Sequence, residues 1–283
     1  MHLNRTLKNK NGVTLIELLI ALVISALLIA ALYRTFIGQQ KTYIVQEQVV
    51  DTQQNVRVAI NKMMRDIRMA GFGGVDSVLN LAGGVNSYTQ PITAAPTTIT
   101  IVGGFKQIKD SNGNPITVSS IGPGANQITL SVSTGEFDGA AHGYISIGGL
   151  GSYIVQNQPV GTTNVLTLDR DPTNINPVGA FIFKVQAITY DINALMLRRN
   201  ENTGGGAQPL AENIENLGFR YFDGGTPTTP PQETADLAKI RMIEVTVTAR
   251  TNISDPDYKG GVGGYRRRQI ASNIHVRNMG ISP

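Results

Sequence analysis

One carboxylate, Glu17, lies near the start of a segment that is otherwise almost wholly apolar. The segment covers residues 13–33, and its other polar members are Thr14 and Ser25. A charged group inside a bilayer is costly, so a carboxylate kept there indicates a function. Gly12 lies five residues before it, behind a basic leader that carries Arg5, Lys8 and Lys10. A secretory signal would have its small-residue cleavage site after the apolar stretch and not before it.

The apolar segment is long enough to span a membrane. Its residues 13–33, at 1.5 Å each, give roughly 30 Å, the thickness of one hydrocarbon core. The basic residues before it predict a cytoplasmic N-terminus, with everything after Tyr33 on the outside. We therefore expect a single-pass inner-membrane protein.

The helical pattern continues beyond the membrane segment. Apolar or small residues recur at intervals of three and four, namely Val45, Val49, Thr52, Val56, Ala59, Met63, Ile67 and Ala70. This stripe predicts an amphipathic helix whose apolar face packs on a core. Joined to the membrane half, the helix covers 13–70 and is about 87 Å long. We expect Gly38 to be a flexible point and the glycines at 71, 73 and 74 to end the helix.

After the helix the hydrophobic period changes to two. We expect strands at 97–102, 127–132, 144–147, 164–168, 181–191, 195–198, 217–222, 239–250 and 268–276. Loops rich in Gly, Pro and Asn separate them. The predicted fold class is α+β, with the long helix packed on a mainly antiparallel sheet domain over 71–283 that contains a β-rich insertion.

Composition excludes several classes of site. The 283 residues include no cysteine, so disulfides and thiolate metal sites are excluded. The three histidines (His2, His142 and His275) are far apart in sequence, and no nucleophilic triad, phosphate loop or dinucleotide fingerprint occurs. We expect no enzymatic activity, no cofactor and no metal. The formal charge of +4 comes partly from the leader, so it is weak evidence for nucleic acid.

Two charged motifs have alternative interpretations. The pairs Asp169/Asp171 and Asp255/Asp257 could supply oxygen ligands to calcium, but they lack regular ligand spacing, and turn-forming Asp is the expected reading. Arg266, Arg267 and Arg268 could bind a DNA backbone, but such a run is more typical of a solvated or protected strand edge. We expect no nucleic-acid partner.

The N-terminal motif resembles that of type IV pilins and pseudopilins. Gly12 matches the last leader residue of their precursors, and Val-Thr-Leu-Ile-Glu at 13–17 matches the start of their mature chains. The resemblance implies that a prepilin peptidase cuts after Gly12 and N-methylates Val13. It also implies a role for Glu17 in assembly, by pairing with the new amine. Val13 stands where Phe is usual, and Arg34 where major pilins often have Pro, which favours a minor component.

The last third of the chain resembles minor pilins of the PilW type. The blocks are 212–223, 240–250 and 267–278, and the J-type pseudopilins of type II secretion share their plan. The resemblance implies a minor pilin that acts in pilus assembly, in a priming or tip complex that supports motility, adhesion or DNA uptake. The expected partners are the inner membrane, prepilin peptidase, other major and minor pilins, and a tip adhesin. A J-type pseudopilin and a membrane-anchored binding module that never polymerises remain alternatives.

Overall fold

The computed structural model describes residues 12–81, 84–122, 124–132, 143–156, 164–226, 228–255 and 258–279. The chain divides into two compact units, Met1–Val50 and Asp51–Pro283. Each is described by itself. His2 and His142, like the basic residues of the leader, lie outside the described residues.

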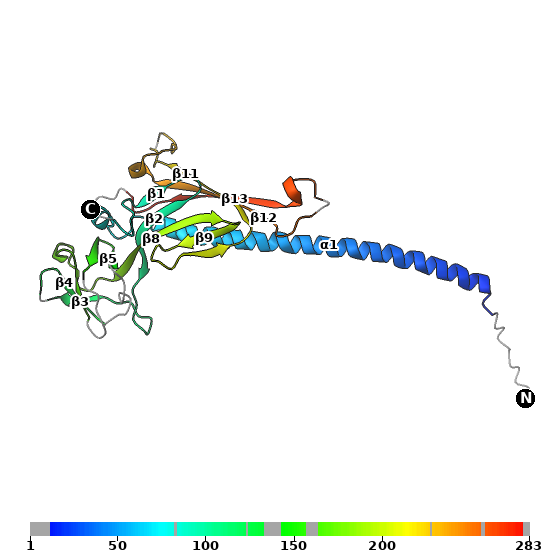
Figure 1. Ribbon diagram of the computed structural model, residues 1–283, viewed down its shortest axis with the longest axis horizontal. Coiled ribbons are helices and arrows are strands. Elements are labelled where there is room, and N and C mark those ends of the chain that lie inside the picture. The colour runs from blue at the N-terminus through cyan, green and yellow to red at the C-terminus, as the bar shows by residue number, and fades with distance from the viewer. Residues whose placement is uncertain are drawn as a thin grey trace, which may run out of the picture. The chain divides into compact units, whose positions relative to one another are not determined.

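A single helix, α1, covers Leu15–Arg68 (Figure 1). The prediction of 13–70 is confirmed to within two residues at each end. The helix continues through Gly38 without a break. In its first part, up to Val50, most apolar side chains are exposed, and Val45 and Val49 of the predicted stripe are only half-buried. The fully buried face therefore begins at Thr52.

The described part of the second unit is mostly antiparallel sheet. Its strands are β1 (Ile92–Ala94), β2 (Ile99–Gln107), β3 (Val118–Ile121), β4 (Gln127–Leu130), β5 (Gly143–Ile147), β6 (Gly151–Val155), β7 (Val165–Thr167), β8 (Ile182–Asn193), β9 (Met196–Asn200), β10 (Ala207–Ala211), β11 (Ile214–Phe222), β12 (Met242–Arg250) and β13 (Arg267–His275). Its short helical elements are α2 (Asp76–Leu79) and the 3-10 turns η1 (Thr173–Ile175), η2 (Leu237–Lys239) and η3 (Val262–Gly264).

The strands form three sheets. A seven-stranded sheet has the order β1-β2-β8-β5-β6, with β9 pairing to β8 and β10 to β9. The other two are β11-β12-β13 and β3-β4-β7, and within each of them neighbouring strands are antiparallel. The predicted alternation is clearest in β12, where buried and half-buried residues alternate along the whole strand. The expected α+β class, with a long apolar helix and mainly antiparallel sheet, is confirmed.

The main core joins the amphipathic part of α1 to two sheets. On the helix, Val56, Ala59, Met63 and Ile67 are fully buried, and so is Ala70 just after its end, as the stripe predicts. They share one apolar cluster with residues of β11 and β12, such as Leu217 and Val245, and of β8 and β9, such as Ile188 and Leu197. The predicted packing of the helix stripe on an apolar sheet face is thus confirmed.

A second core lies within residues 108–182. It is built from β3 to β7 and the start of β8, with Ile116, Ile128, Ile145, Leu166 and Ile182 among its buried members. Figure 1 shows β3 and β4 apart from β12 and β13 within this unit. A β-rich insertion is expected within 71–283, and this part of the domain has a core of its own.

The helix ends at a glycine-dependent turn. Gly73 has φ +103°, and a Cβ there would lie 2.7 Å from the side chain of Ser146. Its carbonyl oxygen accepts hydrogen bonds from the buried hydroxyls of Ser146 and Ser152, at 3.0 and 2.6 Å. The turn therefore anchors the end of α1 to β5 and β6, and a side chain at residue 73 would displace it.

A buried carboxylate on α1 was not anticipated from the sequence. Asp66 is 3% exposed, and its partners are Lys62 at 3.1 Å, Tyr190 Oη at 2.7 Å and Arg199 Nε at 2.9 Å. Burial and the adjacent Asp66 carboxylate raise the pKa of Tyr190 far above its ordinary value. Burial opposes the charge on Arg199, but hydrogen bonds to Glu201 and Asp66 outweigh it and raise the pKa of that guanidinium. The network ties the helix to β8 and β9.

Candidate processing and assembly site

The predicted processing site lies at the start of α1. Gly12, Val13 and Thr14 precede the first helical residue, Leu15. The Thr14 N–H and hydroxyl both donate to Oε2 of Glu17, at 2.9 and 2.8 Å. The Glu17 N–H in turn donates to Thr14 Oγ1 at 3.3 Å. This reciprocal arrangement is a capping box, in which Thr14 is the N-cap and Glu17 the third helical residue.

Capping occupies only one side of the Glu17 carboxylate. Both bonds from Thr14 end on Oε2, and Oε1 has no hydrogen-bond partner among the residues that the structure describes. The carboxylate is exposed and lies at the positive end of the helix dipole, which favours its negative charge. One oxygen therefore completes the helix start while the other remains able to accept a donor from another molecule.

Thr14 is the residue that sequence reasoning missed at this site. The signal was present, because Thr-x-x-Glu at 14–17 before an apolar run is the sequence pattern of a capping box. The resemblance implies a partner for Glu17 only in the amine that cleavage creates. In the uncut chain it already has a partner within its own helix.

The chain itself does not require glycine at position 12. A Cβ placed on Gly12 would meet no atom within 4 Å, and its φ is not in the left-handed region. Val13, on the other side of the predicted cleaved bond, is 75% exposed. A glycine that neither packing nor backbone conformation demands is consistent with a requirement imposed by another protein.

The apolar segment that follows has exposed side chains. The large apolar side chains of residues 15–33 range from 48% exposed at Val23 to 84% at Leu15. Among the described residues, α1 is the one helix long and apolar enough to cross a membrane. So much exposed apolar surface requires a lipid or protein environment. These features fit a membrane anchor.

The two aspartate motifs form local contacts instead of an oxygen cage. Asp169 accepts the Ile154 N–H at 2.8 Å and pairs with Arg170, while Asp171 accepts the Thr173 N–H at 2.8 Å in a turn. Asp255 pairs with Arg266, and Asp257 lies outside the described residues. No group of three or more His, Asp or Glu side chains that could hold a metal occurs in the part of the chain that is described.

The arginine run at the start of β13 is largely engaged within the chain. Arg266 Nη2 lies 3.0 Å from Asp255, and Arg267 Nη2 donates to Glu215 at 2.8 Å. The hydrogen bond from Arg267 lowers the pKa of Glu215 below its ordinary value. The guanidinium of Arg266 also stacks over Tyr258, at 4.5 Å from the ring centre. These contacts favour a role in holding the β12–β13 loop, with Arg268 left exposed.

Comparison with known proteins places the N-terminus in a defined group. Residues 7–33 match the family model described as the prokaryotic N-terminal methylation motif, a stretch that contains Gly12, Val13 and Glu17. A type IV-like pilin from Thermus thermophilus resembles the chain at 13% identity, over 48% of this chain and 86% of that one, with a TM-score of 0.24. That score is too low to establish a shared fold. A search among curated proteins finds no similar sequence. The chain is thus pilin-like through its N-terminal methylation motif.

Proposed function

We propose that this chain is a minor pilin precursor, cut between Gly12 and Val13 and then built into a type IV pilus. Residues 1–12 are the leader, 13–33 the transmembrane half of the helix, and 71–283 the soluble pilin domain. The main support for this proposal is the match of residues 7–33 to the N-terminal methylation motif. That stretch contains a glycine, the bond that follows it and the glutamate that caps the helix. A prepilin peptidase removes the leader and methylates the amine of Val13.

Cleavage and docking use the same few residues. Hydrolysis of the Gly12–Val13 bond leaves the Gly12 carboxylate on the leader and an amine on Val13, which is protonated at neutral pH. The capping bond from the Thr14 N–H survives the cut, because that N–H belongs to the next residue. Glu17 Oε1 then accepts the Val13 ammonium of a neighbouring subunit in the membrane. An axially misplaced subunit leaves both charges unpaired in lipid, so the pair sets the register of assembly.

Mass spectrometry of the membrane-extracted protein tests the processing step. We expect an N-terminus at methylated Val13 in the wild type and at Met1 in Gly12→Val. Gly38→Val is a matched control, because a Cβ at Gly38 also meets no atom within 4 Å and that site lies far along the chain from the cut. An intact Met1 in the wild type would instead support a membrane-anchored module that never polymerises.

The minor role is supported by two further features. The insertion with its own core at 108–182 adds bulk that would be repeated in every subunit of a packed shaft. Val13 and Arg34 replace residues usual in major pilins. We therefore assign the chain to a priming or tip complex, in contact with other pilins and a tip adhesin, moving from the inner membrane to the pilus. Motility, adhesion or DNA uptake would then follow from the pilus it helps to start.

Deletion of the gene distinguishes this role from that of a J-type pseudopilin. Loss of surface pili with exoprotein secretion intact is the expected result. Loss of secretion with pili intact would assign the chain to type II secretion. Complementation with the wild-type gene controls for effects on neighbouring genes.

A further inference from the structure

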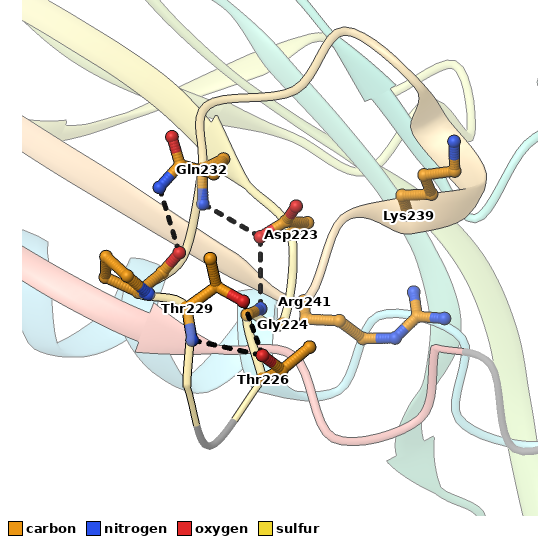
Figure 2. Close-up of a pocket in the computed structure, with 9 residues that line it drawn as sticks. Asp223, Gly224, Thr226, Thr229, Gln232, Lys239 and Arg241 are labelled. Carbon is orange, nitrogen blue, oxygen red and sulfur yellow. Dashed lines mark hydrogen bonds between the residues drawn. The ribbon is translucent and has the colours of Figure 1, made fainter.

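A pocket of about 440 Å³ lies in the loop between β11 and β12, with one lining residue at the end of the 212–223 block and another at the start of the 240–250 block (Figure 2). Figure 2 shows Thr226, Thr229 and Gln232 on one side, Lys239 and Arg241 on the other, and Asp223 between them. Its volume is within the range of small-ligand sites. Neither the N-terminal motif nor the proposed assembly role gives it a purpose.

The threonine side of the pocket is preorganised. Asp223 Oδ1 accepts the N–H groups of Gly225 and Gln232, at 3.0 and 2.8 Å, and so joins the two ends of the loop. Thr226 and Thr229 exchange backbone hydrogen bonds of 2.8 and 3.2 Å. Gly225 has φ +61°, and a Cβ there would lie 2.8 Å from the Thr229 carbonyl oxygen. The loop is thus held in shape by its own contacts, which reduces the entropy lost on binding.

The opposite side presents fixed positive charge. Arg241 Nη1 donates to the carbonyl oxygens of Ala238 and Ile240, at 2.8 and 2.9 Å, and these bonds orient the guanidinium. Arg241 has no carboxylate partner within the described ranges of the chain. Lys239 lies 3.2 Å from Asp236, but its side chain is 70% exposed and can reorient. An oriented guanidinium without an acidic partner suits a carboxylate ligand.

The other residues that line the pocket indicate which class of carboxylate-containing molecule fits it. The backbone groups of Thr226 and Thr229 are bonded to each other, so an extended peptide could not add as a strand at these residues. Besides its cations, the pocket offers the hydroxyls of Thr226 and Thr229, which hydrogen-bond to each other, and the amide of Gln232, which donates to the Pro230 carbonyl oxygen. The remaining acceptor capacity of these hydroxyl and amide oxygens matches the hydroxyl groups of a sugar, and the apolar part of the lining can pack against its ring. We propose that this pocket binds an acidic sugar, with Arg241 and Lys239 facing its carboxylate and Thr226, Thr229 and Gln232 facing its hydroxyls.

Saturation-transfer NMR on the full-length protein in detergent micelles tests this assignment. The probes are D-galacturonate, neutral D-galactose and N-acetylglutamate amide, which carries a carboxylate on a peptide-like frame. We expect D-galacturonate to bind at least about tenfold more tightly than either of the others, since a charge-assisted contact is roughly twice as strong as a neutral one. Arg241→Gln should weaken galacturonate binding by about tenfold, with Arg268→Gln, an exposed arginine on β13, as the matched control.

Each other outcome overturns the proposal. If galacturonate and galactose bind with equal affinity, Arg241 and Lys239 do not recognise a carboxylate. If the glutamate derivative binds as tightly as galacturonate, the pocket recognises an acidic peptide instead of a sugar. Absence of galacturonate binding removes the site. If Arg241→Gln lowers the unfolding midpoint, Lys239→Gln serves instead, because its side chain is 70% exposed and its ion pair with Asp236 is local and exposed. Ligand binding depends neither on pilus formation nor on processing of the N-terminus. A negative binding result therefore would not contradict the proposed function.

Discussion

Glu17 and Asp66 are two carboxylates on one helix, and the fold treats them in opposite ways. Asp66 is 3% exposed and takes donors from Lys62, Tyr190 and Arg199. Glu17 is exposed, and Thr14 alone of the described residues donates to its side chain. The charge of Asp66 is therefore satisfied by its own chain, whereas that of Glu17 is only half used. The second oxygen of Glu17 is able to accept a donor from another molecule, as the proposed assembly role expects.

The apolar residues of α1 repeat the same contrast. Ile67 is fully buried in the main core, whereas Ile24 is 53% exposed. Both are isoleucines in the same element, so residue type does not distinguish them. The second part of the helix is stabilised by packing on a sheet, whereas the apolar side chains of the first part are exposed and would be covered by lipid or by another molecule. Substitutions on the two parts should accordingly affect different measurements.

Glu17→Gln should have the largest effect, and on assembly alone. Gln keeps an oxygen that can accept the Thr14 N–H, so the cap remains while the charge is lost. We expect incorporation into pili to fall by at least about tenfold, because the Val13 ammonium of the neighbour then lies in lipid without a counter-charge. Immunogold labelling of sheared pili, normalised to membrane-bound protein, measures this.

Thr14→Val is the control that separates the cap from the charge. It removes the hydroxyl bonds but keeps the backbone donor and the Glu17 anion. We expect incorporation near the wild-type level. If Thr14→Val fails as completely as Glu17→Gln, the helix cap and not the charge is what assembly requires.

Asp66→Ala should have the largest effect on folding. It leaves Arg199 and the Tyr190 hydroxyl buried without their acceptor, and breaking such a pair costs about 3–5 kcal/mol. Urea unfolding of the full chain in micelles, followed by tyrosine fluorescence, gives the change in free energy of unfolding. Asp51→Ala, at an exposed position of the same helix, should change it by less than about 0.5 kcal/mol. Equal changes in the free energy of unfolding for the two variants would mean that the buried contacts of Asp66 stabilise the fold no more than an exposed carboxylate does.

Tyr190→Phe should cost less than Asp66→Ala, because Asp66 keeps its two cations. The lost bond is a buried 2.7 Å contact from a hydroxyl to a charged group, which contributes about 1.5–3 kcal/mol. Tyr43→Phe, with the parent tyrosine 68% exposed on the first part of the helix, is the neutral control. A loss as large as that of Asp66→Ala would mean that Tyr190, and not Arg199, holds the network together.

Patterns of apolar residues predicted the fold better than they predicted its polar contacts. The stripe at Val56, Met63 and Ile67 and the alternation in β12 follow directly from burial, which has a fixed period in helices and strands. The short strands β1, β3, β6 and β10 are not among the predicted strands. In β1, β3 and β10 a single residue of each is buried, whereas in β6 the buried residues do not alternate regularly. Asp66 was missed because two of its three partners, Tyr190 and Arg199, lie on β8 and β9, more than 120 positions away. The cost of burying the Asp66 carboxylate is offset by donors from distant strands. The local sequence around residue 66 therefore does not predict that this residue is buried.

Glu201→Gln should give the smallest effect, and a pH-dependent one, because Glu201 is the exposed end of the Asp66 network. A hydrogen bond from Arg199 holds the pKa of Glu201 below its ordinary value of 4.5. A lowered carboxyl pKa stabilises the fold above the unfolded value and loses that contribution as pH falls through the folded value. The side chain is 48% exposed, so the difference between wild type and variant should be at most about 1 kcal/mol at pH 7. Unfolding midpoints should converge once the pH is well below 4.5, whereas Glu212→Gln, at an exposed position, should match the wild type throughout. A difference that persists at low pH would mean that Glu201 acts through packing and not through its charge.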